Sequence, residues 1–253
     1  MHAMFSTLLA AIAASNFVAV LGSPITTDVS IIARSNSGAK LRLPPFLDAE
    51  GHHESSYKSL PEGWAYGNWK ETYSSQPAYL ELQNYEFDSY PLVPQSEELP
   101  GQNVDLLSWT LENDTTLYTQ YGIDTPKRSS DKSLGPNWDD VFDYVPTGDL
   151  SDQSNSYAYL AWGYDTDGVE YTVIYETAIA ATGSPACIDI ESRSTTGPSK
   201  ETYDEIVAGL FALDNEEITE LTRELEPLVH NGARDGFGPV ECDEACRNNT
   251  LPE

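Results

Sequence analysis

The sequence has little positive charge. Lysine and arginine together number 13 against 41 aspartates and glutamates, and the formal net charge is −28. A surface this acidic repels nucleic acid and anionic lipid, because both carry dense negative charge. We therefore expect no nucleic-acid partner, and we interpret the charge mainly as a source of solubility.

Motifs for cofactors and for common catalytic machinery are also lacking. The sequence contains no nucleophile elbow, zinc-binding string or phosphate-binding loop. The adjacent His52 and His53 would point to opposite faces of a strand, so they do not indicate a metal site. Adjacent acidic residues such as Asp139 and Asp140 are ordinary in so acidic a chain and do not indicate a glycosidase. We expect no cofactor and no metal.

Cysteines are few, namely Cys187, Cys242 and Cys246. In an oxidising compartment an odd number leaves one thiol over or pairs it between chains. We predict a bridge from Cys187 to Cys242 or Cys246, which would tie the C-terminal tail to the body. A local bridge between Cys242 and Cys246 is the alternative.

Long apolar runs are confined to the N-terminus. Residues 1–22 carry no acidic side chain and are apolar over most of residues 5–21. This pattern indicates a secretory signal peptide, because the continuous apolar core is too short for a membrane span. We expect a secreted or secretory-lumen protein without a membrane span. Two Asn-x-Thr patterns, at Asn113 and Asn248, are then predicted to be glycosylated.

The rest of the chain divides by its hydrophobic period. Residues 23–60 show no clean period, and we expect an N-terminal arm or a processed pro-segment. Residues 61–195 are predicted to form about eight antiparallel strands. Residues 196–228 have helical spacing and are predicted to pack as helices on these strands, and residues 229–253 form a tail with the cysteine pair.

Local signals support this division. Asp167 and Gly168 join two β-rich runs and predict a hairpin turn. Ser199 is placed to cap the first helix, and a second short helix is predicted from Asp214 to a stop at Pro227. About eight strands can close into an up-and-down barrel with room for one small ligand. A β-sandwich would show the same strands, and periodicity does not say which strand faces point inward.

Three stretches resemble the lipocalin family. Gly67-Asn68-Trp69 resembles the Gly-x-Trp that opens the first barrel strand. Residues 106–123 and 189–221 are similar to later strands and to the closing strand, Arg, Pro-containing turn and helix, most closely in the lipocalin domain of violaxanthin de-epoxidase. That enzyme's cysteine-rich N-terminal domain is missing here, so its redox chemistry is not implied.

The resemblance implies an all-β fold with a C-terminal helix, built as an eight-stranded antiparallel lipocalin-like barrel. It also implies that Arg193 lies across the indole of Trp69 and closes one end. Function would then lie in the cavity, where aromatic walls and phenolic donors suit an apolar metabolite. Tyr118, Tyr159 and Tyr175 are candidate catalytic donors. The candidate ligand contacts are Trp109, Tyr118, Trp138, Tyr144, Tyr159, Trp162 and Tyr175.

Two functions fit such a cavity. The first is a cofactor-independent cyclase, an isomerase or lyase of secondary metabolism that catalyses a pericyclic reaction of the hetero-Diels–Alder type. A signal peptide, glycosylation patterns and no cofactor motif are similar in type to fungal lipocalin-like hetero-Diels–Alderases, which join units such as a tropolone and a humulene-type terpene. The second is a carrier that retains a small apolar ligand unchanged. The sequence leaves the oligomeric state open, including a dimer.

Overall fold

Most of the regular structure is β-strand. The computed structural model describes residues 40–48, 57–114 and 116–250, which all belong to one unit of the chain, residues 37–253. The strands in these described ranges are β1 (Gly67–Ser74), β2 (Leu82–Pro91), β3 (Asn103–Leu111), β4 (Tyr118–Pro126), β5 (Val141–Pro146), β6 (Asn155–Tyr164), β7 (Glu170–Glu176), β8 (Cys187–Ser192) and β9 (Glu226–Pro227).

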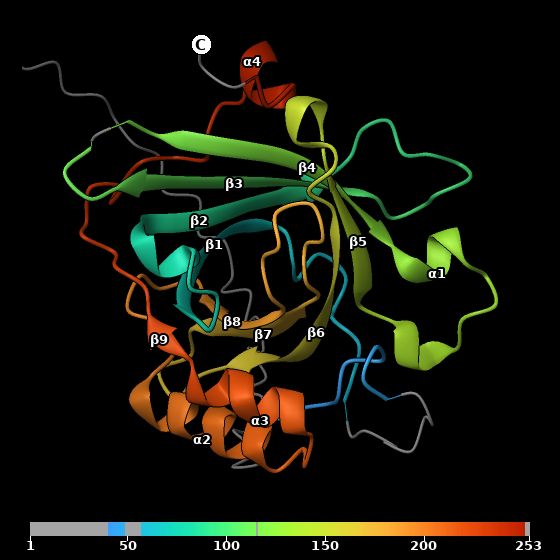
Figure 1. The fold of residues 1–253 in the computed structure, drawn as a ribbon, viewed down its shortest axis with the longest axis vertical. Coiled ribbons are helices and arrows are strands. Elements are labelled where there is room, and N and C mark those ends of the chain that lie inside the picture. Colours follow the sequence, from blue (N-terminus) through green and yellow to red (C-terminus); the bar gives the residue numbers. More distant parts are fainter. Residues whose placement is uncertain (1–39, 49–56, 115, 251–253) are drawn as a thin grey trace, which may run out of the picture. The chain divides into compact units, whose positions relative to one another are not determined.

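Strands β1 to β8 form a closed antiparallel barrel (Figure 1). Each strand pairs with the next in sequence, and β1 pairs with both β2 and β8, so no open edge separates the first strand from the last. The short β9 adds to β1 beyond the ring. The predicted fold class, an all-β, eight-stranded antiparallel up-and-down barrel of the lipocalin type, is confirmed, and the β-sandwich alternative is excluded.

Helices are short, and the two longest, α2 and α3, lie outside the barrel wall. The helical elements are η1 (Tyr79–Glu81), α1 (Lys127–Ser130), η2 (Pro136–Trp138), η3 (Gly148–Leu150), α2 (Lys200–Phe211), α3 (Glu216–Arg223) and α4 (Glu244–Arg247). Within the described part of the chain, no helix combines the length and apolar character needed to cross a bilayer.

Helices α2 and α3 cover the outer face of β7 and β8, as Figure 1 shows. Ile188 and Ile190 of β8 point outward and pack with Ile206, Leu210 and Ile218, and all five are fully buried. Fully burying an aliphatic side chain stabilises the fold by about 1.5–3 kcal/mol. The main apolar core therefore lies between the barrel and its helices, and the barrel interior is left for other side chains.

The helix ends differ slightly from the sequence-based expectation. Ser199 caps α2, as predicted, by accepting a hydrogen bond from the Thr202 N–H. The second helix is capped by Asn215 instead of starting at Asp214, because Asp214 adopts a left-handed φ of 51° that ends the preceding turn. The helix ends before Pro227, which lies in β9.

Part of the N-terminal arm is packed against the barrel. The guanidinium of Arg42 donates to the backbone oxygens of Tyr159 and Asp139 at 2.7 and 2.8 Å, and only 4% of the residue is exposed. Leu43 belongs to the core under the helices. The described residues of the predicted arm therefore contribute to the fold, whether or not an earlier segment is processed.

The C-terminal residues 228–250, here called the C-terminal strap, cross the outer faces of β2, β3 and β4. The Arg234 guanidinium pairs with Glu86 of β2 at 3.3 Å, and both side chains are less than one-tenth exposed. Further along, the buried Asn249 side chain bonds the backbone of Tyr121 in β4 and of Thr147. The predicted tail is thus an integral layer of the unit.

The predicted bridge from Cys187 to the tail is wrong. Cys242 and Cys246 are bonded to each other within the C-terminal strap, which was the alternative. Cys187 is a buried free thiol. The physical reason is topological: Cys187 begins β8 and points into the barrel, whereas the C-terminal strap runs along the outside.

Three predictions stay predictions: the signal peptide, the absence of a metal role for His52 and His53, and glycosylation. The signal peptide at residues 1–22 and the histidine pair lie outside the described residues. Asn113 and Asn248 are both exposed, which leaves their side chains accessible to a glycosyl transfer.

Candidate functional site

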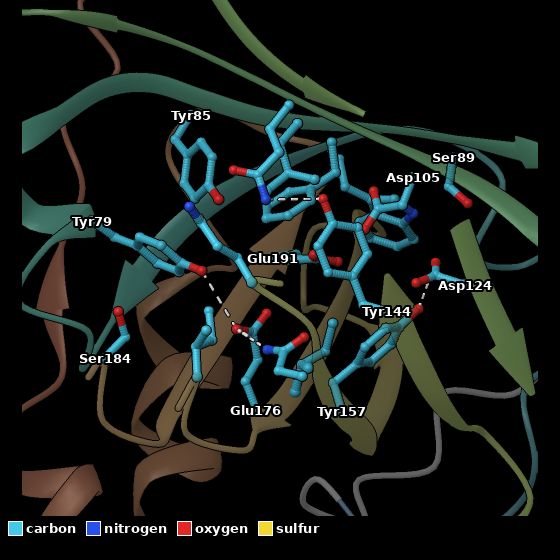
Figure 2. A pocket seen from close by; sticks show the side chains of 18 of the residues that line it. Tyr79, Tyr85, Ser89, Asp105, Asp124, Tyr144, Tyr157, Glu176, Ser184 and Glu191 are labelled. Atoms are coloured by element: carbon cyan, nitrogen blue, oxygen red, sulfur yellow. Dashed lines mark hydrogen bonds between the residues drawn. The ribbon is translucent and has the colours of Figure 1, made fainter. Parts of the chain in front are cut away.

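The barrel encloses a cavity of about 230 Å³ (Figure 2). Aromatic side chains form most of its wall, and polar side chains from η1 and from the ends of β6 and β7 gather near the loops at one end. The lining residues used below are Trp69, Tyr79, Tyr85, Phe87, Asp105, Trp109, Gln120, Asp124, Tyr144, Asn155, Tyr157, Tyr159, Glu176 and Glu191.

A bulge in β2 decides which of its side chains point inward. Asn84 adopts φ 51°, and the register of β2 against β3 shifts between Gln83 and Glu86. A bulge of this kind inserts one residue and re-aims the side chains that follow. It leaves Tyr85 and Phe87 on the cavity wall while Glu86 points out to the C-terminal strap.

Three of the predicted aromatic contacts line the cavity, namely Trp109, Tyr144 and Tyr159. The Tyr144 hydroxyl accepts a hydrogen bond from Gln120 at 3.1 Å, which Figure 2 shows across the wall. Tyr159 comes just before a register shift between β6 and β7. The structure therefore brings these three together around one space.

Two other predicted contacts lie under the outer helices and loops. The Tyr175 hydroxyl donates to Glu217 of α3 at 2.7 Å, so this ring faces away from the cavity. Trp138 packs edge-on against Phe46 of the N-terminal arm, with ring centroids 5.3 Å apart. Neither side chain belongs to the cavity wall.

The last two predicted contacts also lie off the wall. Tyr118 donates to Asp114 at 2.8 Å and stacks against Trp109 from outside the cavity. The Trp162 indole donates to the backbone oxygen of Lys58 at 2.6 Å. A catalytic role for Tyr118 or Tyr175 would need a ligand on the outer surface.

One end of the barrel is closed by an aromatic and an arginine. The Arg193 guanidinium lies 3.5 Å above the centre of the Trp69 ring, the arrangement that the resemblance implies. It also donates to the backbone oxygens of Asn68, Trp64 and Tyr66 at 2.8–3.0 Å. Such a cation–π contact is worth about 1–2 kcal/mol when partly shielded from water. The cavity is thus sealed at this end.

Carboxyl groups are the unexpected component of the wall. Asp105, Asp124, Glu176 and Glu191 line the cavity, and no lysine, arginine or histidine occurs among the described residues that line it. Burial raises the pKa of Asp124 from 3.8 to about 8 and that of Glu191 from 4.5 to about 7. Burial favours the neutral acid because the charged form loses its hydration.

Asp124 combines burial with a free oxygen. Its Oδ2 accepts a hydrogen bond from the Tyr157 hydroxyl at 2.8 Å, a contact that lowers the pKa and only partly offsets burial. Its Oδ1 is buried and has no hydrogen-bond partner. A protonated Asp124 therefore carries a donor at Oδ1 without a protein acceptor. Less than 1 Å² of this atom is exposed, so a ligand oxygen can accept from it only where the wall shifts to uncover it; Figure 2 shows the pair at the cavity wall.

The opposite side of the cavity carries a second polar group. Glu176 Oε2 accepts hydrogen bonds from the Tyr79 hydroxyl at 3.4 Å and from Asn155 Nδ2 at 3.2 Å. These three residues come from η1, β6 and β7 (Figure 2). They tie the loops at this end to one another and give it polar character.

Comparison with known proteins gives one sequence relative. No family model matches the chain. A protein named botcinic acid biosynthesis cluster B protein 12, from Botryotinia fuckeliana (strain B05.10), is 34% identical over 215 residues, which cover 83% of this chain and 92% of that protein. This chain belongs to the cluster B protein 12 family.

Solved structures give a more distant likeness. Lobster apocrustacyanin A1 aligns over 77% of this chain and 89% of its own at 14% identity and a TM-score of 0.43. Per a 4 from cockroaches aligns over 71% of this chain and 94% of its own, at 15% identity and a TM-score of 0.45. The amine binding protein of Rhodnius prolixus, in its tryptamine complex, aligns over 79% of this chain and 93% of its own, at 13% identity and a TM-score of 0.44. At these values the likeness supports no functional assignment.

The acidic wall of this cluster B protein 12 family member was missed by the sequence reasoning. The sequence left the inward strand faces open and named only aromatic side chains as candidate contacts, because alternation in an antiparallel sheet usually places acidic residues toward solvent. In β8 the alternation is inverted, because Ile188 and Ile190 face the helices while Asp189 and Glu191 face the interior. The helical segment that follows β8 could have indicated this inversion. Its apolar stripe has to pack on an apolar strand face, which leaves the polar face of that strand for the interior.

Proposed function

We propose that the chain binds one small, largely apolar metabolite in the barrel cavity and catalyses its cofactor-independent cyclisation or isomerisation. The observation that carries the proposal is Asp124, a buried acid with a pKa near 8 and a free Oδ1 on an aromatic wall. Such a group is a proton-bearing hydrogen-bond donor at neutral pH. Aromatic walls around it exclude water and hold an apolar ligand.

The chemistry follows from what this donor can do. A protonated Asp124 donates from Oδ1 to a carbonyl or similar oxygen of the ligand, and Tyr157 holds the other carboxyl oxygen in place. Electron density moves toward that oxygen as a ring closes, so the hydrogen bond strengthens in the transition state. In a pericyclic closure bonds form and break within the substrate, and Asp124 keeps its proton.

Cavity size favours one reacting molecule over two. Small-molecule sites commonly measure about 300–1,000 Å³, and this cavity measures about 230 Å³. A pair of partners such as a tropolone and a humulene-type terpene would need more room than one compact substrate. We therefore favour an intramolecular reaction, in which the wall holds a folded conformer close to the transition state.

Family membership supports the class of pathway. The relative is named for a biosynthesis cluster, which supports a role in secondary metabolism for this chain as well. The disulfide supports an oxidising compartment, in line with the predicted signal peptide. We propose a secreted or secretory-lumen enzyme whose partner is the small metabolite itself.

The experiment compares variants of Asp124 on a natural extract. The purified protein is incubated with an extract of its source organism, and products are followed by mass spectrometry. Asp124→Val removes both donor and acceptor and should lower turnover by roughly 10²–10³-fold, the usual effect of losing one transition-state donor. Asp124→Asn keeps a weaker amide donor, so its turnover should lie between that of the wild type and that of Asp124→Val. Asp152→Asn, on an exposed loop, is the matched control.

A carrier is the second candidate, favoured by the single sealed end and the small enclosed volume. A carrier would retain one unchanged compound at a stoichiometry of one and show no turnover. Turnover that is equal in the wild type and in folded Asp124→Val would refute the catalytic role of this acid.

A further inference from the structure

At one side of the cavity, three side chains with metal-ligating atoms converge, and one of them, Glu176, also lines the cavity. Glu176 of β7 and Cys187 and Asp189 of β8 place one carboxylate oxygen, the thiol sulfur and a second carboxylate oxygen within 4.8 Å of one another. Cys187 is 1% exposed and Asp189 is 2% exposed. Charged carboxylates and thiolates are unfavourable in a buried place, so such a cluster is either neutral or compensated by a cation.

The distances fit a tetrahedral ion. Cys187 Sγ lies 3.3 Å from Asp189 Oδ2 and 3.8 Å from Glu176 Oε2. In a tetrahedral zinc site, with Zn–S near 2.3 Å and Zn–O near 2.1 Å, a sulfur and an oxygen ligand lie about 3.6 Å apart. The three atoms therefore need only small movements to share one ion.

A third acidic side chain supplies an independent observation. Glu71 of β1 is 1% exposed, and its carboxylate oxygens have no close hydrogen-bond partner; only a weaker contact with the Ile190 backbone lowers its pKa. After burial, the charge that acts on it most strongly is that of Asp189, followed by Glu191. A buried carboxyl group without a partner is unfavourable by several kcal/mol unless it is neutral or meets a cation.

Neighbouring groups already orient the ligand atoms. Ser74 Oγ donates to Asp189 Oδ1 at 2.5 Å, which leaves Oδ2 turned toward the thiol. Tyr79 and Asn155 hold Glu176 from the cavity side. Hydrogen bonds of this kind fix the ligands of natural metal sites and tune their affinity.

We propose that Cys187, Asp189 and Glu176 form a binding site for one thiophilic divalent metal ion of the zinc class, with Glu71 as a nearby buried carboxyl group that the charge of the ion would stabilise. Binding replaces the protons of the thiol and of any neutral carboxyl group, which pass to solvent, and three protein–metal bonds form without any change of oxidation state. The ion ties β7 and β8 together beside the cavity. This inference stands apart from the proposed catalysis, which rests on Asp124.

The experiment uses Co²⁺ as a spectroscopic probe and Zn²⁺ as the competing ion. The full chain is freed of metal with a chelator, dialysed, and titrated without oxygen or added thiols, so that the Cys242–Cys246 bridge stays intact. The expected result is one Co²⁺ per chain with a sulfur-to-cobalt charge-transfer band that one equivalent of Zn²⁺ abolishes. The readout needs no substrate, so it is separate from any failure of the proposed catalysis.

Variants assign the ligands. Cys187→Ser should remove the band, and Asp189→Asn should weaken binding by at least about 10–100-fold. Asp105→Asn, which changes another carboxyl group of the interior, and the double variant Cys242→Ser with Cys246→Ser should both bind as the wild type does. Circular dichroism shows that each variant is folded.

Three outcomes would overturn the proposal: no band at one equivalent of Co²⁺, a band that survives in Cys187→Ser, or equal weakening by Asp105→Asn and Asp189→Asn. The last would mean a diffuse attraction of cations to the acidic interior. If Cys187→Ser fails to fold, the Asp189→Asn and Glu176→Gln variants decide the question by the same titration.

Discussion

Replacing Asp124 with asparagine should flatten the dependence of stability on pH. In the folded protein Asp124 is 2% exposed and its pKa is raised from 3.8 to about 8, chiefly by burial. Between these two values the folded protein keeps a proton that the unfolded chain releases. The free energy of unfolding therefore decreases as the pH rises from about 4 to about 8.

The size of the effect follows from linkage. One such proton changes the free energy of unfolding by about 1.4 kcal/mol per pH unit, or about 2.7 kcal/mol between pH 5 and pH 7. Glu191, with a pKa raised to about 7, acts in the same direction and remains in the variant. The stability of Asp124→Asn relative to the wild type should therefore rise by about 2.7 kcal/mol from pH 5 to pH 7.

Urea denaturation at pH 5, 6 and 7, in the presence of a chelator, measures this difference. Constant effects of the amide, such as altered contact with Tyr157, cancel because only the change with pH is compared. The exposed Asp152→Asn variant should follow the wild type at each pH. The difference in the free energy of unfolding between the wild type and Asp124→Asn could instead stay constant within about 0.5 kcal/mol from pH 5 to pH 7. That result would mean that Asp124 is ionised at neutral pH, and it would refute the proposal that Asp124 acts as a protonated donor.

The remaining predictions concern the closed end of the barrel, the cavity wall and the side chains that face the outer helices. Arg193→Ala should lower the free energy of unfolding by about 2–4 kcal/mol, seen as a lower Tm, because three backbone oxygens and a cation–π contact lose their partner. Gly122→Ala should destabilise by about 1–3 kcal/mol in urea and impair ligand retention, because the new Cβ would lie 2.1 Å from a ring carbon of Tyr144. Tyr175→Phe should destabilise by about 1 kcal/mol through the lost bond to Glu217, with retention unchanged; a loss of retention would contradict its outward position.

The order of elements could be predicted because each rests on local chemistry. Gly168 adopts φ 83° in the turn between β6 and β7, the conformation that an Asp-Gly hairpin requires. Ser199 caps its helix through a side-chain contact only three residues long. Closure of the barrel could be inferred only from the resemblance, which linked Trp69 to Arg193 across the chain.

The inward faces could not be predicted from alternation. Alternation assigns polar residues to water, but β8 directs Ile190 to the helices and Asp189 to the interior. The bulge at Asn84 moves the side chains that follow it to the other face of the strand. Such a bulge cannot be predicted from the residue type at that position. Tyr159 and Tyr175 therefore looked equivalent as candidates, although one lines the cavity and the other packs under α3.

The composition of the cavity wall also limits the form in which a guest can arrive. An ionised carboxylate or phosphate would lose its hydration on entering this space, and no cationic lining side chain among the residues described would compensate for that loss. An anionic guest would also favour the neutral form of the lining acids and would be bound poorly if any of them ionised. We therefore expect the cavity to prefer an uncharged guest over a phosphorylated or coenzyme-linked one.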